Sequence, residues 1–199
     1  MLKIGITGGI GSGKTTICKI FEVLGIPVFY ADAAARELMT KDALLVKGVK
    51  DSFGQDSYFA DGSLNNKHIA AIVFNDTAEL DKLNALVHPA VFRAFDSWIE
   101  QIPNKTPYVL KEAALLFESE SYKMCDHNIL VIAPDALKLE RVTKRDSVTE
   151  AQVRARMDKQ FTDEQKAELA DHVIYNNEQT SLIVQVTALH QTFLKLLKK

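Results

Sequence analysis

The sequence predicts an α/β fold of three layers, with helices covering a parallel sheet of five strands. Two observations lead to this prediction. Short apolar runs typical of buried strands alternate with amphipathic helical patterns, and a glycine-rich segment joins the first such run to the first helix. The 199 residues suit a single domain, residues 1–199, with an added part, because domains commonly hold about 100–200 residues.

The glycine-rich segment has the pattern of a phosphate-binding loop, in which a glycine, four further residues and a second glycine precede Lys and Ser or Thr. An apolar run over residues 2–6 precedes it, and a predicted helix over residues 16–24 follows it. Backbone N–H groups can surround a phosphate where side chains are absent and a positive φ costs little. The segment therefore predicts a P-loop NTPase fold with an ATP site. The expected ATP-binding residues are Gly8, Gly9, Ile10, Gly11, Ser12, Gly13, Lys14, Thr15 and Thr16.

Two side chains of this loop have separate predicted tasks. The Lys14 ammonium reaches the β- and γ-phosphates of ATP and so acts in catalysis, while the Thr15 hydroxyl joins the coordination shell of Mg²⁺. The start of the following helix adds unpaired N–H groups and the positive end of a helix dipole, and both favour an anion. ATP as co-substrate and Mg²⁺ are therefore expected here.

Asp32 follows a second short strand, which is predicted over residues 27–30. In open parallel sheets the ligand crevice lies at the carboxyl ends of the strands, which would place Asp32 beside the phosphate loop. Asp is also a favoured N-cap residue, and the next predicted helix starts at residue 33. The residues alone leave both interpretations open.

Residues 40–105 interrupt the alternation of strands and helices and indicate a helical insertion. Such an insertion either holds the acceptor, as in small kinases, or only covers the core. His88, which precedes Pro89 at an expected helix start, is a candidate ligand or a capping or packing residue. Helical segments are expected over residues 67–74, 77–85 and 89–99.

Strands and helices resume after the insertion. Glu112 follows a predicted strand over residues 108–110, either as a carboxylate near Mg²⁺ or the acceptor, or as a solvated loop end. Further strands are predicted over residues 128–133 and 172–175, with a core-packing helix from residue 181 onward. The expected parts are a core of about 1–38, 106–136 and 168–199, an acceptor insertion of about 40–105, and a lid of about 137–165.

Basic residues concentrate on two predicted short helices joined by residues 146–149. A charge run is usually a solvated helix face, and acidic residues interleave here so that i,i+4 pairs can form. In a protein with a triphosphate site, an arginine-bearing hairpin also predicts a lid that closes on the transferring phosphoryl group, and we favour that interpretation. The basic residues are Lys138, Arg141, Lys144, Arg145, Arg154, Arg156 and Lys159.

The composition limits the class of protein. The 24 basic residues nearly balance the 26 acidic residues, which argues against a general nucleic-acid or membrane-surface binder. No apolar run approaches the ~20 residues of a membrane span, and the first residues lack a signal-peptide pattern. Cys18 and Cys125 have no spacing suited to a metal site or a disulfide framework. We expect a cytoplasmic protein without nucleic-acid or membrane partners.

An ordered set of short motifs runs from the phosphate loop to about Asn176. The motifs beyond the loop are Ala31-Asp32 with Ala35-Arg36-Glu37-Leu38, His88-Pro89, Leu115-Leu116-Phe117-Glu118, Arg141 to Arg145-Asp146, Arg156 with Gln160, and Ala170-Asp171 to Asn176. With this set the chain resembles the dephospho-CoA kinase family. The resemblance implies phosphorylation of the 3′-hydroxyl of the adenosine ribose of dephospho-CoA by ATP. The products would be CoA and ADP, in the last step of coenzyme A biosynthesis.

The resemblance also implies roles for individual residues. Asp32 matches the acceptor-side Asp of the family, as general base or orienter of the 3′-hydroxyl. Arg141 and Arg145 match its lid arginines, with charge stabilisation and adenine stacking as candidate roles. Asn176 lies where the last sheet loop of the family meets adenine, although a turn-forming Asn is an alternative. The expected substrate-binding residues are Asp32, Arg36, His88, Glu112 and Leu115, in a monomer or weak homo-oligomer.

The chain departs from the family pattern in two places. The family usually carries Asp-Ala-Asp after its second strand, where this chain has Tyr30 in the first position. It often has Asp, one residue and Pro before Leu-Leu-Phe-Glu, where this chain has Glu112 and Ala114. Glu keeps the charge with a longer reach, and the loss of Pro relaxes the backbone. Neither change removes a required phosphate ligand.

Two alternatives remain open to test. Another P-loop kinase, acting on a small molecule or a nucleotide, would share the loop and the lid, so its acceptor preference would distinguish it. A nucleotide-dependent switch would need a guanine-selecting Asn-Lys-x-Asp run. The Asn-Lys pairs at residues 66–67 and 104–105 lack that trailing Asp.

Overall fold

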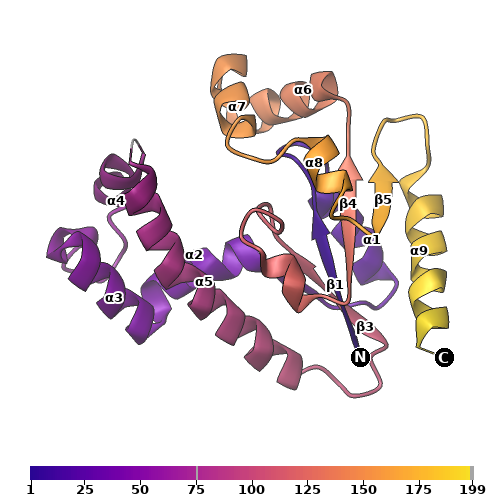
Figure 1. The fold of residues 1–199 in the computed structure, drawn as a ribbon, viewed down its shortest axis with the longest axis horizontal. Helices are drawn as coiled ribbons and strands as arrows, with labels where there is room; N and C mark the ends of the chain where they lie inside the picture. Colours follow the sequence, from indigo (N-terminus) through magenta and orange to yellow (C-terminus); the bar gives the residue numbers. More distant parts are fainter. Residues whose placement is uncertain (75, 198–199) are drawn as a thin grey trace. The chain divides into compact units, whose positions relative to one another are not determined.

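The computed structural model describes residues 1–74 and 76–197. Two compact units make up the chain (Figure 1). The sheet unit comprises Met1–Tyr30 and Ile102–Lys199, and the helical unit comprises Ala31–Gln101. The helical unit overlaps the expected insertion of residues 40–105, but it starts earlier because all of the helix that follows the second strand belongs to it.

The sheet unit is built on a parallel sheet of five strands, as predicted. The strands are β1 (Leu2–Thr7), β2 (Val28–Tyr30), β3 (Tyr108–Glu112), β4 (His127–Ile132) and β5 (His172–Tyr175). Their order across the sheet is β2-β3-β1-β4-β5, and every described pair is parallel. The carboxyl ends of the strands therefore share one edge, and the phosphate loop leaves the central strand β1 at that edge.

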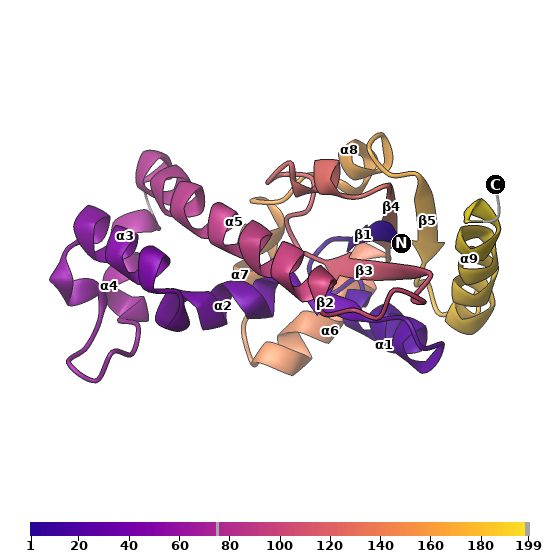
Figure 2. The same cartoon turned by 90° about the horizontal axis from the view of Figure 1, so that it is seen from below.

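Helices cover both faces of this sheet. The α-helices that the structure describes in the sheet unit are α1 (Lys14–Val23), α6 (Asp135–Asp146), α7 (Glu150–Met157), α8 (Asp163–Ala167) and α9 (Leu182–Leu196). On one face, Phe21 of α1 and Phe193 of α9 lie with ring centroids 6.3 and 5.3 Å from that of Tyr108. Val109 and Leu130 point to the opposite face, because side chains alternate along a strand, and both are also buried. Figure 2 shows α1 and α8 on opposite sides of the sheet, which gives the three layers predicted.

The helical unit has a hydrophobic core of its own. Its helices are α2 (Ala31–Lys41), α3 (Ala43–Phe53), α4 (Asn66–Val73) and α5 (Thr77–Glu100). The buried residues of that core are Met39, Leu45, Val49, Phe53, Tyr58, Ile69 and Ala90. The buried Tyr58 hydroxyl donates a hydrogen bond to the Met39 carbonyl oxygen at 2.7 Å. Burial of these apolar groups stabilises the helical unit.

The prediction of two separate helices over residues 77–85 and 89–99 was wrong. Both stretches belong to α5, a single helix of 24 residues that contains Pro89. A proline inside a helix removes one backbone hydrogen bond and usually kinks or ends it. Here Ala90 beside the proline is part of the core of the helical unit, and Val91 and Phe95 are buried too. Packing of this face offsets the lost hydrogen bond.

Helix α3 was not among the predicted segments, although its two ends carry ordinary boundary residues. The Asp42 side chain accepts a hydrogen bond from the Leu45 N–H at 2.8 Å and so caps the start of the helix. Gly54, with φ of 88°, ends it. An Asp before the apolar run and a Gly after it were visible in the sequence.

The two cysteines are free thiols, as the sequence indicates. Burial raises the pKa of both, for Cys125 to about 11, so both thiols stay protonated near neutral pH. Among residues 1–74 and 76–197, no helix is both long enough and apolar enough to cross a membrane.

Candidate active site

Glycine geometry shapes the phosphate loop between β1 and α1. Gly11 and Gly13 have φ of 78° and 92°, in the left-handed region that residues with a Cβ seldom adopt. A Cβ on Gly11 would lie 2.6 Å from the Lys138 carbonyl oxygen. A Cβ on Gly13 would overlap the side-chain amide nitrogen of Asn176. The loop therefore needs glycine at both positions for conformation and for space.

Hydrogen bonds hold the loop in place from inside and outside. The Ser12 N–H donates to the Gly9 carbonyl oxygen at 3.0 Å across the loop. Asn176, directly after β5, donates from Nδ2 to the Ser12 carbonyl oxygen at 2.8 Å. Asn176 was expected near adenine, and that contact stays a prediction. Its role as a brace of the loop was missed, because sequence alone does not show which carbonyl an amide reaches.

Lys14 and Thr15 begin helix α1 at the end of the loop. Lys14 Nζ donates to the Gly8 carbonyl oxygen at 2.8 Å and lies 3.5 Å from the Gly9 carbonyl oxygen. The ammonium is thus folded back over the loop, where a phosphate could take over these contacts. The side chains of Thr15 and Thr16 are exposed on the first turn of α1.

Arg141 of α6 faces a pocket beside the phosphate loop. Its Nη2 lies 3.1 Å from Glu178 Oε1, while Nη1 is buried and has no hydrogen-bond partner among the described residues. The pocket has a volume of about 370 Å³. Its lining residues are Gly13, Thr16, Arg141, Asn176, Glu178, Thr180 and Leu182. A buried guanidinium nitrogen without a partner favours a polar ligand in this pocket.

Comparison with known proteins identifies the family. Residues 2–181 match the family model described as Dephospho-CoA kinase. The chain belongs to the dephospho-CoA kinase family. Dephospho-CoA kinases from Salinibacter ruber and Chlorobaculum tepidum are 42% and 39% identical to it. The first alignment covers 89% of both chains, and the second covers 88% of this chain and 86% of the relative.

Solved structures agree with this assignment. A Thermus thermophilus protein is 30% identical with a TM-score of 0.84, over 98% of this chain and 97% of that one. The dephospho-CoA kinase from Campylobacter jejuni is 27% identical with a TM-score of 0.68, over 97% of each chain. Shikimate kinase from Acinetobacter baumannii, 17% identical with a TM-score of 0.50 over 98% of this chain and 94% of its own, shares the fold alone. The predicted P-loop kinase fold is confirmed.

Arg145, the second arginine matched to the lid of dephospho-CoA kinases, pairs with one carboxylate, that of Asp146, at the surface. Its Nε and Nη2 donate to Asp146 at 2.7 and 3.1 Å, and Arg156 reaches the same carboxylate at 3.0 Å. The Arg145 side chain is 63% exposed. None of its described contacts is with the phosphate loop, so its catalytic role stays a prediction.

Lys138 differs from the other basic residues of α6 because it is buried. Its side chain is 5% exposed, and Nζ lies 2.8 Å from both Asp135 Oδ1 and Asp163 Oδ2. Burial alone would lower the pKa of Lys138, but the two carboxylates outweigh it and the pKa is raised. For this residue the solvated-face interpretation was wrong.

Glu112 is the last residue of β3, level with Ile6 of β1 and Tyr30 of β2. It is 7% exposed, so the interpretation as a solvated loop end was wrong. Burial raises the pKa of Tyr30, and the negative charges of Glu22 and Glu112 add to the shift. A neutral phenol therefore stands where dephospho-CoA kinases usually have a carboxylate. Leu115, a further predicted acceptor contact, is exposed in the loop after β3.

Three predicted acceptor residues belong to the helical unit. Asp32 is the second residue of α2, inside the helix that starts at Ala31, so the N-cap interpretation was wrong. Arg36 lies one turn further along the same helix and is exposed. His88 lies within α5, not at a helix start, and its ring stacks on Phe92 with centroids 6.2 Å apart.

Among the described residues, no cluster of three or more His, Cys, Asp or Glu could hold a metal ion. Such a cluster is not needed for the predicted ion, because Mg²⁺ in kinases is usually held by one or two protein groups, substrate phosphates and waters. The exposed hydroxyl of Thr15 fits this kind of site. Its role as a metal ligand stays a prediction.

Proposed function

We propose that this chain transfers the γ-phosphoryl group of ATP to the 3′-hydroxyl of the adenosine ribose of dephospho-CoA. The bond from the γ-phosphorus to the β,γ-bridging oxygen breaks, a bond to the 3′-oxygen forms, and the hydroxyl proton is released. The products are CoA and ADP, as in the last step of coenzyme A biosynthesis. One observation carries the proposal: a complete phosphate loop at residues 8–15 lies within a stretch, residues 2–181, that matches the dephospho-CoA kinase model.

The nucleotide is bound by the loop and by Arg141. Lys14 exchanges its hydrogen bonds to loop carbonyls for the β- and γ-phosphate oxygens, and it follows the charge that moves to the leaving oxygen. Arg141 supplies its buried, unpartnered Nη1 to the nucleotide in the adjoining pocket. Asn176 keeps the Ser12 carbonyl oxygen turned away from the anion, because it donates a hydrogen bond to that oxygen.

The acceptor is oriented by a separate set of side chains. Asp32 accepts a hydrogen bond from the 3′-hydroxyl and takes its proton as the phosphoryl group arrives. Because the transition state of phosphoryl transfer is loose, this positioning matters at least as much as proton removal. Thr15 would hold Mg²⁺, which neutralises charge on the β- and γ-phosphates. Further proposed acceptor contacts are Arg36, His88, Glu112 and Leu115.

The proposal includes a cellular setting. The near balance of 24 basic and 26 acidic residues supports a protein that binds neither nucleic acid nor a membrane surface. We propose a cytoplasmic monomer or weak homo-oligomer whose acceptor is a small molecule. Analytical ultracentrifugation tests the assembly, and a stable large oligomer would contradict it.

A second candidate is a P-loop kinase for another acceptor, since the fold is shared with shikimate kinase. ADP release with Mg·ATP should be compared for dephospho-CoA, adenosine, nucleoside monophosphates and shikimate. Fast release with dephospho-CoA alone supports the proposal. Fast release with another acceptor and none with dephospho-CoA would replace it with the second candidate.

A further inference from the structure

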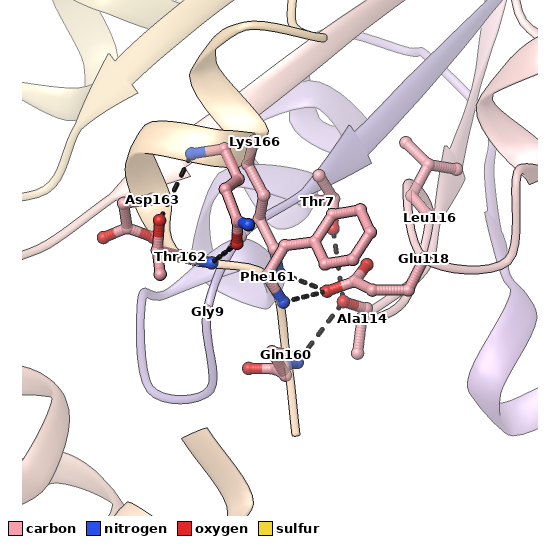
Figure 3. A network of polar contacts seen from close by, with 12 residues as sticks. Thr7, Gly9, Ala114, Leu116, Glu118, Gln160, Phe161, Thr162, Asp163 and Lys166 are labelled. Atoms are coloured by element: carbon pink, nitrogen blue, oxygen red, sulfur yellow. Dashed lines mark hydrogen bonds and ion pairs between the residues drawn. The ribbon is translucent and has the colours of Figure 1, made fainter. Parts of the chain in front are cut away.

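Gln160, three residues beyond the end of α7, lies beside Ala114 of the segment that follows β3 (Figure 3). Its Oε1 accepts a hydrogen bond from the Ile10 N–H of the phosphate loop at 2.9 Å. Its Nε2 donates to the Ala114 carbonyl oxygen at 3.4 Å, and the Thr7 hydroxyl donates to the same oxygen at 3.3 Å. One amide therefore connects the phosphate loop to the segment that follows β3.

The main chain beside Gln160 is fixed by a buried ion pair. Glu118 Oε1 accepts a hydrogen bond from the Phe161 N–H at 2.9 Å and lies 3.0 Å from Lys166 Nζ. The Lys166 side chain is 0% exposed and that of Glu118 is 13% exposed. Loss of one partner would leave a buried charge uncompensated, so the two residues act together. Glu118 thereby holds the peptide that follows Gln160.

Helix α8 is tied on a second side as well. Asp163 at its start pairs with Lys138 of α6 at 2.8 Å. Thr162 and Gln165 form a capping box, with the Thr162 N–H 2.9 Å from Gln165 Oε1 and the Gln165 N–H 3.2 Å from Thr162 Oγ1. The segment that carries Gln160 is therefore anchored both to α6 and to the segment after β3.

We propose that Gln160 is a positioning residue for the phosphate loop. Glu118, whose charge is neutralised by Lys166, fixes the position of the Gln160 side-chain amide by holding the Phe161 N–H. This inference rests on the ATP site of the proposed function. The Ile10 N–H and the Gly9 carbonyl belong to one planar peptide group, so a bond to Gln160 also orients that carbonyl. The Gly9 oxygen accepts from the Ser12 N–H and lies 3.5 Å from Lys14 Nζ. Gln160 thus acts through the backbone on the groups that hold phosphate.

The first test is Gln160→Met, which keeps the length of the side chain and removes both hydrogen bonds. We expect the Kd of Mg·ATP, measured by titration calorimetry, to rise at least about 10-fold, because small displacements of a phosphate site are costly. The value of kcat/KM for ATP should fall in parallel, with an unchanged KM for dephospho-CoA. A merely structural role would lower the melting temperature and leave the Kd of ATP unchanged, and that result would overturn the proposal.

Gln152→Met is the matched control. Gln152 is a glutamine of α7 whose described side-chain hydrogen bonds are all with Thr149, so its replacement should leave ATP binding unchanged. The calorimetric titration needs no acceptor. A wild-type protein that binds ATP but does not phosphorylate dephospho-CoA would therefore refute the proposed function and leave this test valid.

The second test compares two double variants that leave no unpaired buried charge. Glu118→Gln/Lys166→Met keeps an oxygen for the Phe161 N–H, and Glu118→Ala/Lys166→Met does not. We expect the first to bind ATP nearly as well as the wild type and the second to bind it as weakly as Gln160→Met. Adding Gln160→Met to the second should cause no further loss, because both changes remove the same support. Equal ATP affinity of the two double variants would overturn the role of Glu118.

Discussion

The phosphate loop and the arginines of α6 and α7 both contribute positive charge to the sheet unit. They differ in how firmly the surrounding contacts fix their geometry. Loop geometry is fixed by glycines and by two side-chain amides, the buried Asn176 on the Ser12 carbonyl and the part-buried Gln160 on the Ile10 N–H. Arg145 instead pairs with Asp146, and Arg154 with Glu150, at the surface. Exposed pairs contribute only about 0–1 kcal/mol, so they can change partners easily. The loop is preorganised, while the weak surface pair of Arg145 with Asp146 would let its guanidinium turn to phosphate, as the predicted lid role requires.

The largest effect is expected at the loop. Lys14→Ala removes the cation that stabilises negative charge on the β- and γ-phosphates in the transition state. We therefore expect kcat to fall by about 10³-fold. Steady-state kinetics with dephospho-CoA measure the change. Lys19→Ala is the control, because Lys19 lies on the same helix but pairs with Glu22 at the surface. Near-normal turnover of Lys14→Ala would remove the loop from the mechanism.

Arg145→Ala tests whether the surface arginines do exchange partners. If Arg145 leaves Asp146 for the transferring phosphoryl group, kcat should fall by at least about 10²-fold. Arg154→Ala, which breaks the exposed pair with Glu150, should leave kcat unchanged. If the two variants have the same kcat, Arg145 belongs to a solvated helix face, and the account of it as a residue that changes partner during the reaction is wrong.

Asp32→Asn tests the acceptor side of the reaction, for comparison with the changes at the ATP site. The change keeps the size of the side chain and removes its basicity, so kcat should fall by about 10²-fold while the Kd of ATP stays constant. Calorimetry with ATP and single-turnover kinetics separate the two quantities. Asp81→Asn, at an exposed position of α5, is the control. A normal kcat would show that Asp32 has no part in the transfer.

Gly13→Ala tests the preorganisation of the loop. The positive φ strains an alanine by about 1–3 kcal/mol. Overlap of the new Cβ with Asn176 should in addition reduce kcat/KM for ATP by up to about 10²-fold. Gly25 has φ of 81°, and a Cβ added there would have no described heavy atom within 4 Å. Gly25→Ala should therefore show the strain in thermal unfolding without the kinetic loss. Equal kinetics for both variants would contradict a close brace by Asn176.

The smallest effect is expected at the amino end of β5, away from the carboxyl ends of the strands where the phosphate loop lies. Burial lowers the pKa of His172 below its ordinary value of 6.5, and the nearby His127 adds to the shift. The unfolded chain therefore binds this proton more readily, and stability should be lost as the pH falls through about 6.5. Thermal unfolding at pH 5.5 and 7.5 measures the loss, which His172→Phe should reduce. A melting temperature in the wild type that does not depend on pH would contradict this assignment.

The sequence was informative where local patterns decide the structure. Alternating apolar runs and the glycine-rich motif predicted the five strands and the phosphate loop, because both depend on neighbours in the chain. Pro89 misled the prediction, since tertiary packing of α5 outweighs a local rule. Lys138 and Lys166 resemble surface lysines in the sequence. Their burial depends on Asp163 and Glu118, which lie far along the chain, so no local pattern could reveal it.

The most direct test of the account is the product formed from dephospho-CoA and Mg·ATP by the wild-type chain. Mass spectrometry and phosphorus NMR should show one added phosphate, attached at the 3′-oxygen of the adenosine ribose, with one ADP released for each product molecule. Lys14→Ala should form this product only in trace amounts. ATP consumption without a phosphorylated acceptor, or a phosphate at another position, would contradict the proposed function.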